Sequence, residues 1–215
     1  MDAALQQQIE RAGVIAVVTV ESVDAALPLA RALLDGGVTA IELTLRTEAA
    51  MTVLEKLCAE VPELLIGAGT VLTPQQVTRV KAAGAAFAVA PGMNRRVVEA
   101  AQAAELPFAP GICTPSEIEA ALELDCRCLK FFPSEPLGGL RYLKTMATPY
   151  AHLGLRFIPL GGVSPDNAAS YLTERTVLAL GGSWVAPADA IRAGDWTGIT
   201  QRAREAMEIV QATRA

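Results

Sequence analysis

The sequence predicts an α/β protein, a small (β/α)₈ or TIM barrel with an extra N-terminal helix, formed by residues 1–215 as a single domain. Short apolar runs alternate with Ala/Leu-rich helical stretches along the whole chain. The apolar runs are continuous, which is typical of parallel strands covered on both faces. No linker or change in composition interrupts the series, so the β–α units are expected to close into one barrel.

A doubly wound open sheet is the alternative arrangement of the same elements. A glycine-rich loop directly after the first strand would favour it, because such loops hold phosphate groups in open sheets. The residues at that point are Val20, Glu21 and Ser22, which form no such loop. The barrel is therefore preferred.

The predicted strands are short apolar runs bounded by turn-forming residues. They cover residues 14–20, 40–44, 64–67, 87–90, 108–110, 128–131, 156–159 and 177–180. The predicted helices between and after them cover residues 23–34, 48–60, 74–83, 95–104, 116–124, 140–145, 166–172 and 197–213. Residues 3–11 form the extra helix, which is expected to close the bottom of the barrel.

Sequence signals mark where several helices begin and end. Thr73, Thr114 and Ser164 each precede a proline, an order typical of an N-cap residue followed by the first helical turn. The acidic Glu117 soon after Thr114 strengthens that helix start. Glycines at positions 36, 37 and 84 mark helix ends.

The composition excludes several classes of protein. Hydrophobic residues make up 52% of the chain and charged residues 19%, which suits a well-buried α/β domain and argues against disorder. The net charge of −5 argues against a nucleic-acid partner. No apolar stretch is long enough to cross a bilayer, and residues 1–11 are too polar for a secretory signal. A cytoplasmic protein with no membrane partner is expected.

The histidine and cysteine content bears on metal and redox chemistry. His152 is the single histidine, whereas a metal-dependent lyase or hydrolase usually needs several imidazoles. We therefore expect no metal, and we expect no other cofactor. Cys58, Cys113, Cys126 and Cys128 lack the spacing of a metal ribbon or a redox pair, so reduced thiols are expected.

Lys130 is the most informative residue, because it interrupts an apolar strand. It lies between Leu129 and Phe131, in a run that ends at Phe132 and Pro133, whereas the other lysines lie in mixed polar stretches. An ammonium in such surroundings is poorly hydrated, which favours the neutral amine. A neutral amine can form a Schiff base with a ketone. Taken alone, the segment fits a structural ion pair equally well.

Glu42 is the expected partner of Lys130. If its neighbours Ile41 and Leu43 face the helices, the alternation of side chains along a strand turns Glu42 into the barrel. A carboxylate there needs a partner, because an unpaired buried charge is costly. The pair is either a buried structural ion pair or an acid/base group beside a nucleophile. The second interpretation is favoured, since an ion pair of this kind adds little stability.

Further polar and glycine residues follow other predicted strands. Arg46 can bind a carboxylate through two parallel hydrogen bonds, and Thr70 can donate a further hydrogen bond from its hydroxyl. Together they form a candidate binding site for a keto-acid carboxylate. Gly161 and Gly162 follow the seventh strand, and Ser183 follows a glycine pair after the eighth. Barrels often bind phosphate on backbone N–H groups at these two strand ends.

Taken together, these segments resemble the 2-keto-3-deoxy-6-phosphogluconate (KDPG/KHG) aldolase family. The resemblance covers nearly the whole chain and is carried by residues 42–47 (ELTLRT), 67–72 (GAGTVL), 129–133 (LKFFP), 161–165 (GGVSP) and 181–184 (GGSW). It implies a metal-independent class I (Schiff-base) aldolase on a small barrel, usually a homotrimer. The implied reaction is cleavage of the phosphorylated keto acid to pyruvate and glyceraldehyde 3-phosphate in the Entner–Doudoroff pathway of carbohydrate metabolism, and members often act on 4-hydroxy-2-oxoglutarate too.

By this resemblance, Lys130 is the Schiff-base lysine and Glu42 the general acid/base. The residues implied to hold the substrate are Arg46 and Thr70 for its carboxylate, Pro91 and Phe132 for the pocket wall, and Gly161, Gly162 and Ser183 for its phosphate.

One position departs from the family pattern. Leu160 stands where the commonest family motif, Pro-Thr-Gly-Gly, has threonine, and related galactonate-specific aldolases also have an apolar residue there. The galactonate branch usually has a Pro-Leu-Asn-Ser motif where residues 44–47 here are TLRT. The gluconate substrate is therefore preferred, with the galactonate epimer as the alternative. A non-catalytic phosphate-binding barrel, or an isomerase with Glu42 as sole base, is the alternative from another class.

Overall fold

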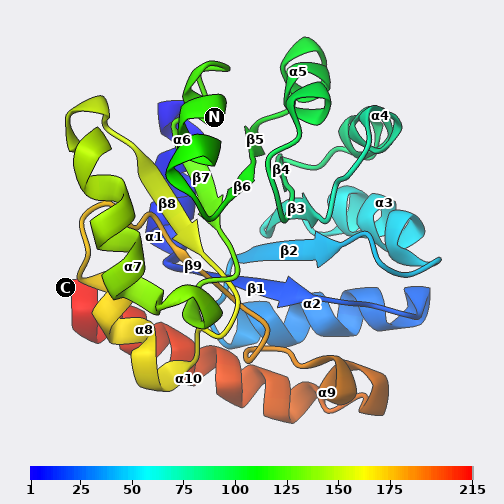
Figure 1. Cartoon of the computed structure of the whole chain (residues 1–215). Coiled ribbons are helices and arrows are strands. Elements are labelled where there is room, and N and C mark those ends of the chain that lie inside the picture. Colours follow the sequence, from blue (N-terminus) through cyan, green and yellow to red (C-terminus); the bar gives the residue numbers. More distant parts are fainter. Residues whose placement is uncertain (215) are drawn as a thin grey trace.

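The computed structural model describes residues 1–214, and its centre is a curled sheet of parallel strands (Figure 1). The larger sheet has six strands in the order β5-β4-β3-β2-β1-β9, all pairs parallel. These strands are β1 (Val14–Val18), β2 (Ala40–Thr44), β3 (Leu65–Gly69), β4 (Phe87–Val89), β5 (Phe108–Ala109) and β9 (Leu180–Gly182). The smaller sheet, in the order β6-β7-β8, contains β6 (Gly111–Ile112), β7 (Cys128–Phe131) and β8 (Arg156–Pro159).

Backbone hydrogen bonds connect the two sheets on both sides. Pro110 separates β5 from β6, and its carbonyl oxygen accepts from Lys130 N at 2.9 Å. On the other side, Phe157 N donates to Thr176 O and Leu178 N donates to Phe157 O, both at 2.8 Å, beside a parallel bridge between Phe157 and Val177. The expected α/β class with a curled parallel sheet is therefore confirmed.

Helices cover the outer face of the curled sheet (Figure 1). They are α2 (Ala26–Asp35), α3 (Ala50–Glu60), α4 (Pro74–Ala82), α5 (Arg95–Ala103), α6 (Pro115–Leu122), α7 (Gly139–Ala147), α8 (Pro165–Leu172), α9 (Ala188–Ala193) and α10 (Trp196–Arg214), with α1 (Ala3–Ala12) preceding β1. Three 3₁₀ helices are η1 (Val23–Ala25), η2 (Glu135–Leu137) and η3 (Thr148–Leu153). The long α10 packs against α2 and α8, which joins the end of the chain to its beginning.

The buried apolar residues form two clusters on opposite faces of the sheet. The larger cluster lies between the sheet and the surrounding helices and includes Ile41 and Leu43. The second cluster lies on the inner face and includes Phe87 and Ile158, together with Ile9 from α1. The N-terminal helix therefore packs against the inner face of the sheet, as expected of a helix that closes its bottom.

The predicted N-caps are confirmed by hydrogen bonds. The side chains of Thr73 and Thr114 accept from the backbone N–H groups of Gln76 and Glu117, and both form capping boxes. At Ser164, the Asn167 side chain accepts from the Ser164 backbone N–H at 2.9 Å. These bonds satisfy N–H groups that have no partner within the helix, so each helix begins at a defined residue after its strand.

Some boundaries differ from the sequence prediction for physical reasons. The strand expected at 177–180 lies at Leu180–Gly182, because pairing with β1 outweighs the low strand propensity of two glycines. The strand expected at 108–110 is divided at Pro110, which has no N–H to donate to a strand ladder. Helix α9 is absent from the predicted elements, because it is too short for a helical period to be visible in the sequence.

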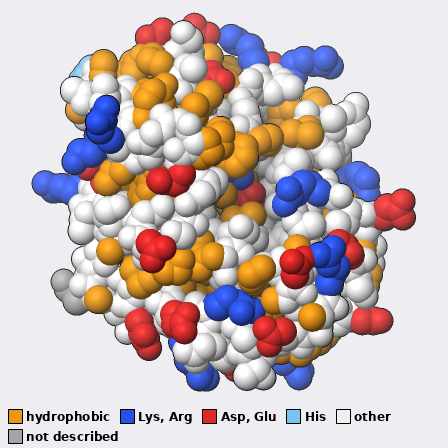
Figure 2. All heavy atoms as spheres, turned by 60° about the horizontal axis from the view of Figure 1, so that its bottom comes forward, with side chains coloured by type: hydrophobic (Ala, Val, Ile, Leu, Met, Phe, Trp, Pro, Cys, Tyr) orange, Lys and Arg blue, Asp and Glu red, His pale blue; other side chains and the backbone are white. Residues whose placement is uncertain are grey.

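Within the described residues, no helix has the length and apolarity needed to cross a bilayer. On the face in Figure 2, acidic and basic side chains are interspersed among apolar ones. That face offers no continuous basic surface of the kind that binds nucleic acid.

The first prediction concerns Glu117. Although partial burial acts to raise its pKa, hydrogen bonds from Cys113 N–H and from the N–H and hydroxyl of Thr114 outweigh burial and lower the pKa below the ordinary value. A lowered folded-state pKa contributes stability above the unfolded-state pKa, and this contribution is lost as pH falls through the folded-state value. Glu117→Gln should lower the free energy of unfolding at pH 7 by about 0.5–1 kcal/mol.

The measurement is urea unfolding of the wild type and Glu117→Gln between pH 7 and pH 3. The difference in stability should shrink as pH falls, because the wild-type carboxylate becomes protonated. Glu55→Gln, on the exposed side of α3, is the matched control and should change the free energy of unfolding at pH 7 by less than about 0.5 kcal/mol. A Glu117→Gln difference that stays constant with pH would contradict the assignment.

Candidate active site

The expected site residues meet in one cavity of about 230 Å³ at the carboxyl ends of the strands. Its lining residues are Val17, Glu42, Thr44, Arg46, Thr70, Pro91, Lys130, Phe132, Leu160, Gly161, Gly181 and Ser183. Parallel strands align their carboxyl ends, so residues far apart in sequence converge there. Of the predicted site residues, only Gly162 does not line the cavity, and it adjoins Gly161 in the same loop.

Lys130 and Glu42 form a buried pair at the centre of this cavity. Lys130 Nζ donates to Glu42 Oε1 at 2.8 Å, and the two residues are 5% and 3% exposed. Glu42 comes from β2 and Lys130 from β7, which belong to different sheets. The Lys130 amine also lies 5.5 Å from the centre of the Phe132 ring. The predicted direction of Glu42 is confirmed, because Ile41 and Leu43 pack on the helix side.

Glycine at position 69 gives the Glu42 carboxylate its place. A Cβ atom on Gly69 would lie 2.2 Å from Glu42 Oε1, which is far too close for any real contact. Gly69 faces Thr44 across the β2–β3 pairing, so it lies directly beside the segment that carries Glu42. The Glu42 carboxylate can therefore occupy its position only because residue 69 has no side chain.

Arg46 is held at the mouth of the cavity by a chain of hydroxyl groups. Its Nη2 donates to Thr19 Oγ1 at 2.7 Å, and Thr19 Oγ1 lies 2.9 Å from Thr44 Oγ1. Thr44 donates its hydroxyl proton to Val18 O at 3.1 Å, so Thr19 must be the donor to Thr44. The Arg46 side chain is exposed, and it lines the cavity.

Thr70 has an unusual backbone conformation. Its φ is 60°, in the left-handed region that a β-branched residue rarely adopts. Such strain costs on the order of 1–3 kcal/mol and is often found where a side chain must face a functional site. Thr70 lines the same cavity as Glu42 and Lys130, so the strained residue is one that faces the candidate site.

The glycine loop after β8 forms the opposite wall. Gly161 and Gly162 have φ values of 90° and 85°, so the turn requires residues that tolerate positive φ. A Cβ atom on Gly161 would lie 3.1 Å from the Phe132 ring. The loop runs into the capped first turn of α8, where backbone N–H groups favour an anion. Ser183, which follows β9, is exposed at the cavity rim.

Sequence reasoning missed three lining residues: Val17, Thr44 and Gly181. Val17 and Thr44 are inward positions of β1 and β2, and strand alternation continued from Glu42 would have indicated Thr44. Gly181 follows the strand expected at 177–180, but it lies in β9, and a Cβ atom there would lie 2.3 Å from Leu160. Within the described residues, no group of His, Cys, Asp and Glu is arranged to hold a metal ion.

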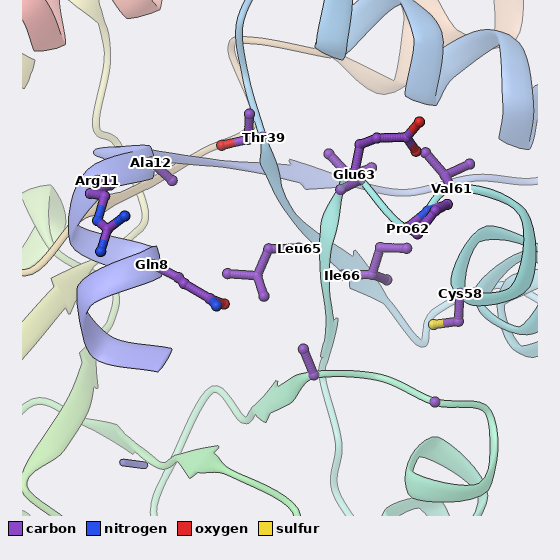
Figure 3. Close-up of a pocket in the computed structure, with 13 residues that line it drawn as sticks. Gln8, Arg11, Ala12, Thr39, Cys58, Val61, Pro62, Glu63, Leu65 and Ile66 are labelled. Carbon is purple, nitrogen blue, oxygen red and sulfur yellow. The ribbon is translucent and has the colours of Figure 1, made fainter. Parts of the chain in front are cut away.

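A second and larger cavity, of about 510 Å³, lies at the other end of the strands (Figure 3). Gln8 and Arg11 of α1 line one side, and Thr39 and Leu65 lie near the starts of β2 and β3. Catalytic groups of barrel enzymes gather at the carboxyl ends of the strands, whereas the amino ends serve stability. The smaller cavity with the Lys130–Glu42 pair is therefore the candidate active site.

A buried amine beside a carboxylate, at the carboxyl ends of parallel strands, is the arrangement expected of a Schiff-base lyase, and comparison with known proteins identifies the family. Residues 5–202 match the family described as KDPG and KHG aldolase. The chain belongs to this family and is an aldolase.

Individual relatives agree with this assignment. The chain is 45% identical over 195 residues to the KHG/KDPG aldolase of Escherichia coli, with 91% of each chain covered. It is 44% identical over 202 residues to the 2-dehydro-3-deoxy-phosphogluconate aldolase of Dickeya dadantii, with 94% of each covered. Among solved structures, the KDPG aldolase of Legionella pneumophila, with pyruvate captured as a covalent carbinolamine, superposes with a TM-score of 0.88 at 39% identity, covering 93% of this chain and 96% of that one.

The second prediction tests the space reserved for Glu42. Gly69→Ala should displace the carboxylate from Lys130, because the added methyl group occupies the position of Oε1. A displacement of about 1 Å at a reacting group can lower the rate on the order of 100-fold. The measurement is release of pyruvate from 2-keto-3-deoxy-6-phosphogluconate, with thermal unfolding to compare stability.

Gly92→Ala is the matched control, because a Cβ atom at Gly92 meets no atom within 4 Å. This variant should keep both its rate and its stability. A Gly69→Ala enzyme with wild-type activity would show that the Glu42 position is not constrained by β3.

Proposed function

We propose that this chain cleaves 2-keto-3-deoxy-6-phosphogluconate to pyruvate and glyceraldehyde 3-phosphate, with Lys130 as the Schiff-base nucleophile and Glu42 as the general acid/base. The observation that carries the proposal is the buried pair, with 2.8 Å between Lys130 Nζ and Glu42 Oε1, inside a cavity at the carboxyl ends of the strands. The names of the Escherichia coli and Dickeya dadantii relatives support this substrate. The carbinolamine in the Legionella pneumophila enzyme supports the covalent route.

The reaction begins with the neutral amine. Transfer of one proton from Lys130 to Glu42 gives an amine and a carboxylic acid, which the 2.8 Å contact permits without movement. The amine nitrogen attacks the ketone carbon to give a carbinolamine, and Glu42 returns the proton to the departing hydroxyl, which leaves as water. The product is a protonated imine on Lys130.

Bond cleavage uses the positive charge of this imine. Glu42, now a carboxylate, takes the proton from the hydroxyl on the fourth carbon of the substrate. The electrons of the bond between the third and fourth carbons move to the imine nitrogen, which gives an enamine and releases the aldehyde. Protonation of the enamine and addition of water then release pyruvate and regenerate the amine. Shelter from solvent strengthens the interaction between the positive imine and the Glu42 carboxylate, because the local dielectric is low.

The remaining wall residues bind the substrate in this proposal. Arg46 and Thr70 hold the carboxylate next to the ketone, and Pro91 and Phe132 form the apolar wall. The phosphate is held by the residues at the ends of β8 and β9, which are Gly161, Gly162 and Ser183. Contacts far from the reacting bond position the substrate and so contribute to the rate as well as to binding. With a net charge of −5, the chain depends on these local groups to attract an anion.

We also infer the finer features of the fold and assembly. The hydrogen bonds on both sides of the smaller sheet support closure of the strands into one (β/α)₈ barrel, with residues 1–215 as a single domain. A cytoplasmic homotrimer is the assembly that the family resemblance implies.

The galactonate epimer remains the alternative substrate because of Leu160. This buried residue lines the cavity, packs over Gly181, and precedes the glycine loop. An apolar side chain there cannot bond to a substrate hydroxyl, so relaxed selectivity at the fourth carbon is expected. The proposal extends to 4-hydroxy-2-oxoglutarate as a second substrate of the same residues.

The third prediction is covalent trapping. Borohydride added with pyruvate should reduce the imine and fix a pyruvyl adduct to Lys130, which peptide mass spectrometry locates. Lys130→Ala should abolish both trapping and cleavage, whereas Lys144→Ala, at the exposed end of α7, should keep both. An adduct that persists at another lysine in Lys130→Ala would refute the assignment. A non-catalytic phosphate-binding barrel or an isomerase with Glu42 as sole base would give no adduct.

The fourth prediction concerns stereochemical selection. Leu160→Thr should raise the ratio of kcat/KM for the gluconate substrate over its galactonate epimer by roughly tenfold, since a threonine hydroxyl can distinguish the two positions of the fourth hydroxyl. Leu160→Val, which stays apolar, is the control and should leave the ratio nearly unchanged. An equal ratio in the threonine variant would show that another residue selects the epimer.

A further inference from the structure

A chain of buried polar groups lies beside the Gly161–Gly162 loop. Tyr171 of α8 is 1% exposed, and Ser134, just after β7, is fully buried. Tyr171 Oη donates to Glu135 Oε1 at 2.5 Å, and Ser134 Oγ lies 2.5 Å from Tyr171 Oη. A phenol has one proton, which Tyr171 gives to Glu135, so Ser134 must be the donor to Tyr171. The order is therefore Ser134 to Tyr171 to the Glu135 carboxylate.

The same turn is bonded to the glycine loop through its backbone. Ser134 N donates to Leu160 O at 2.7 Å, and Glu135 N donates to Gly161 O at 2.9 Å. A Cβ atom on Gly162 would lie 2.6 Å from Glu135 Cβ, so the two residues are in direct contact. The Ser134–Glu135 turn thus supports the loop from behind along its whole length.

Tyr171 closes this arrangement from the other side. The helix that carries it, α8, begins directly after the glycine loop, so the tyrosine hydroxyl bonds the helix back to the turn after β7. Burial, and next its hydrogen bond to Glu135, raise the pKa of Tyr171 above the ordinary value, so its hydroxyl remains a donor at neutral pH. Neither Ser134 nor Tyr171 lines the active-site cavity, so any effect on substrate passes through the loop.

We propose that Tyr171 is a positioning residue for the phosphate end of the substrate, holding the Ser134–Glu135 turn against the Gly161–Gly162 loop and fixing the Glu135 carboxylate beside α8. This inference rests on the proposed function, in which the loop binds the phosphate. Without the tyrosine hydroxyl, the backbone bonds from Ser134 and Glu135 to the loop remain, but the turn that makes them is no longer held to α8. The Glu135 carboxylate also loses its hydrogen-bond donor and is released next to a bound anion. Both changes weaken phosphate binding and neither touches Lys130.

The fifth prediction is a selective effect of Tyr171→Phe, which removes one oxygen and keeps the ring. Its KM for 2-keto-3-deoxy-6-phosphogluconate should rise roughly tenfold, in line with loss of a hydrogen bond to a charged group. The pyruvate concentration that gives half-maximal borohydride trapping should not change, because pyruvate has no phosphate. Tyr142→Phe is the matched control, since Tyr142 donates its hydroxyl to Cys113 O and does not contact the glycine loop. It should change neither quantity.

Ser134→Ala is the second variant and removes the other bond to Tyr171. It should raise KM for the phosphorylated substrate in the same direction by a smaller factor, again without an effect on pyruvate trapping. Unchanged KM values in both variants, or equal losses for the phosphorylated substrate and for pyruvate, would overturn the inference. Failure of the proposed function would look different, since wild-type enzyme would then form no pyruvate adduct at all.

Discussion

The structure is organised around two opposite charges that water cannot easily reach. Lys130 and Glu42 lie on strands of different sheets, and their 2.8 Å contact fixes how those strands face each other. Burying an ion pair gains little stability compared with an apolar pair, and loss of one partner leaves an uncompensated charge. The arrangement is therefore better explained by chemistry than by folding, since the proposed mechanism needs a nucleophile and a base side by side.

The surroundings of the pair limit how it can move. Gly69 leaves room for the carboxylate, while the Phe132 ring lies near the amine. The hydroxyl groups of Thr19 and Thr44 hold Arg46 at the cavity mouth, and Tyr171 fixes the turn behind the glycine loop. The geometry of the candidate site is thus maintained by hydroxyl groups and small residues outside the Lys130–Glu42 pair.

The sequence indicated which residues meet in the candidate site where their chemistry contradicts the local pattern. Lys130 and Glu42 were visible because each interrupts an apolar strand, and the helix starts were visible because capping is a local interaction. Features that depend on three-dimensional packing were not visible. Gly181 follows the predicted strand in the sequence, but in the structure it lies in β9 and pairs with Ile15 of β1. Val17 lines the cavity but has no chemical signal that distinguishes it from its neighbours. Nor does any sequence pattern indicate the left-handed conformation of Thr70, which only the surrounding structure can impose.

The contact between Leu160 and Gly181 limits which pairs of side chains these two positions of the pocket can hold. The leucine fills the volume that a side chain at position 181 would occupy, so the two positions form one complementary unit across neighbouring strands. A bulkier residue at 181 is compatible only with a smaller one at 160. A reduction at 160 alone opens space without moving the backbone. New substrate shapes can therefore be accommodated by exchanging volume between these two neighbours, while the amine and its carboxylate stay in place.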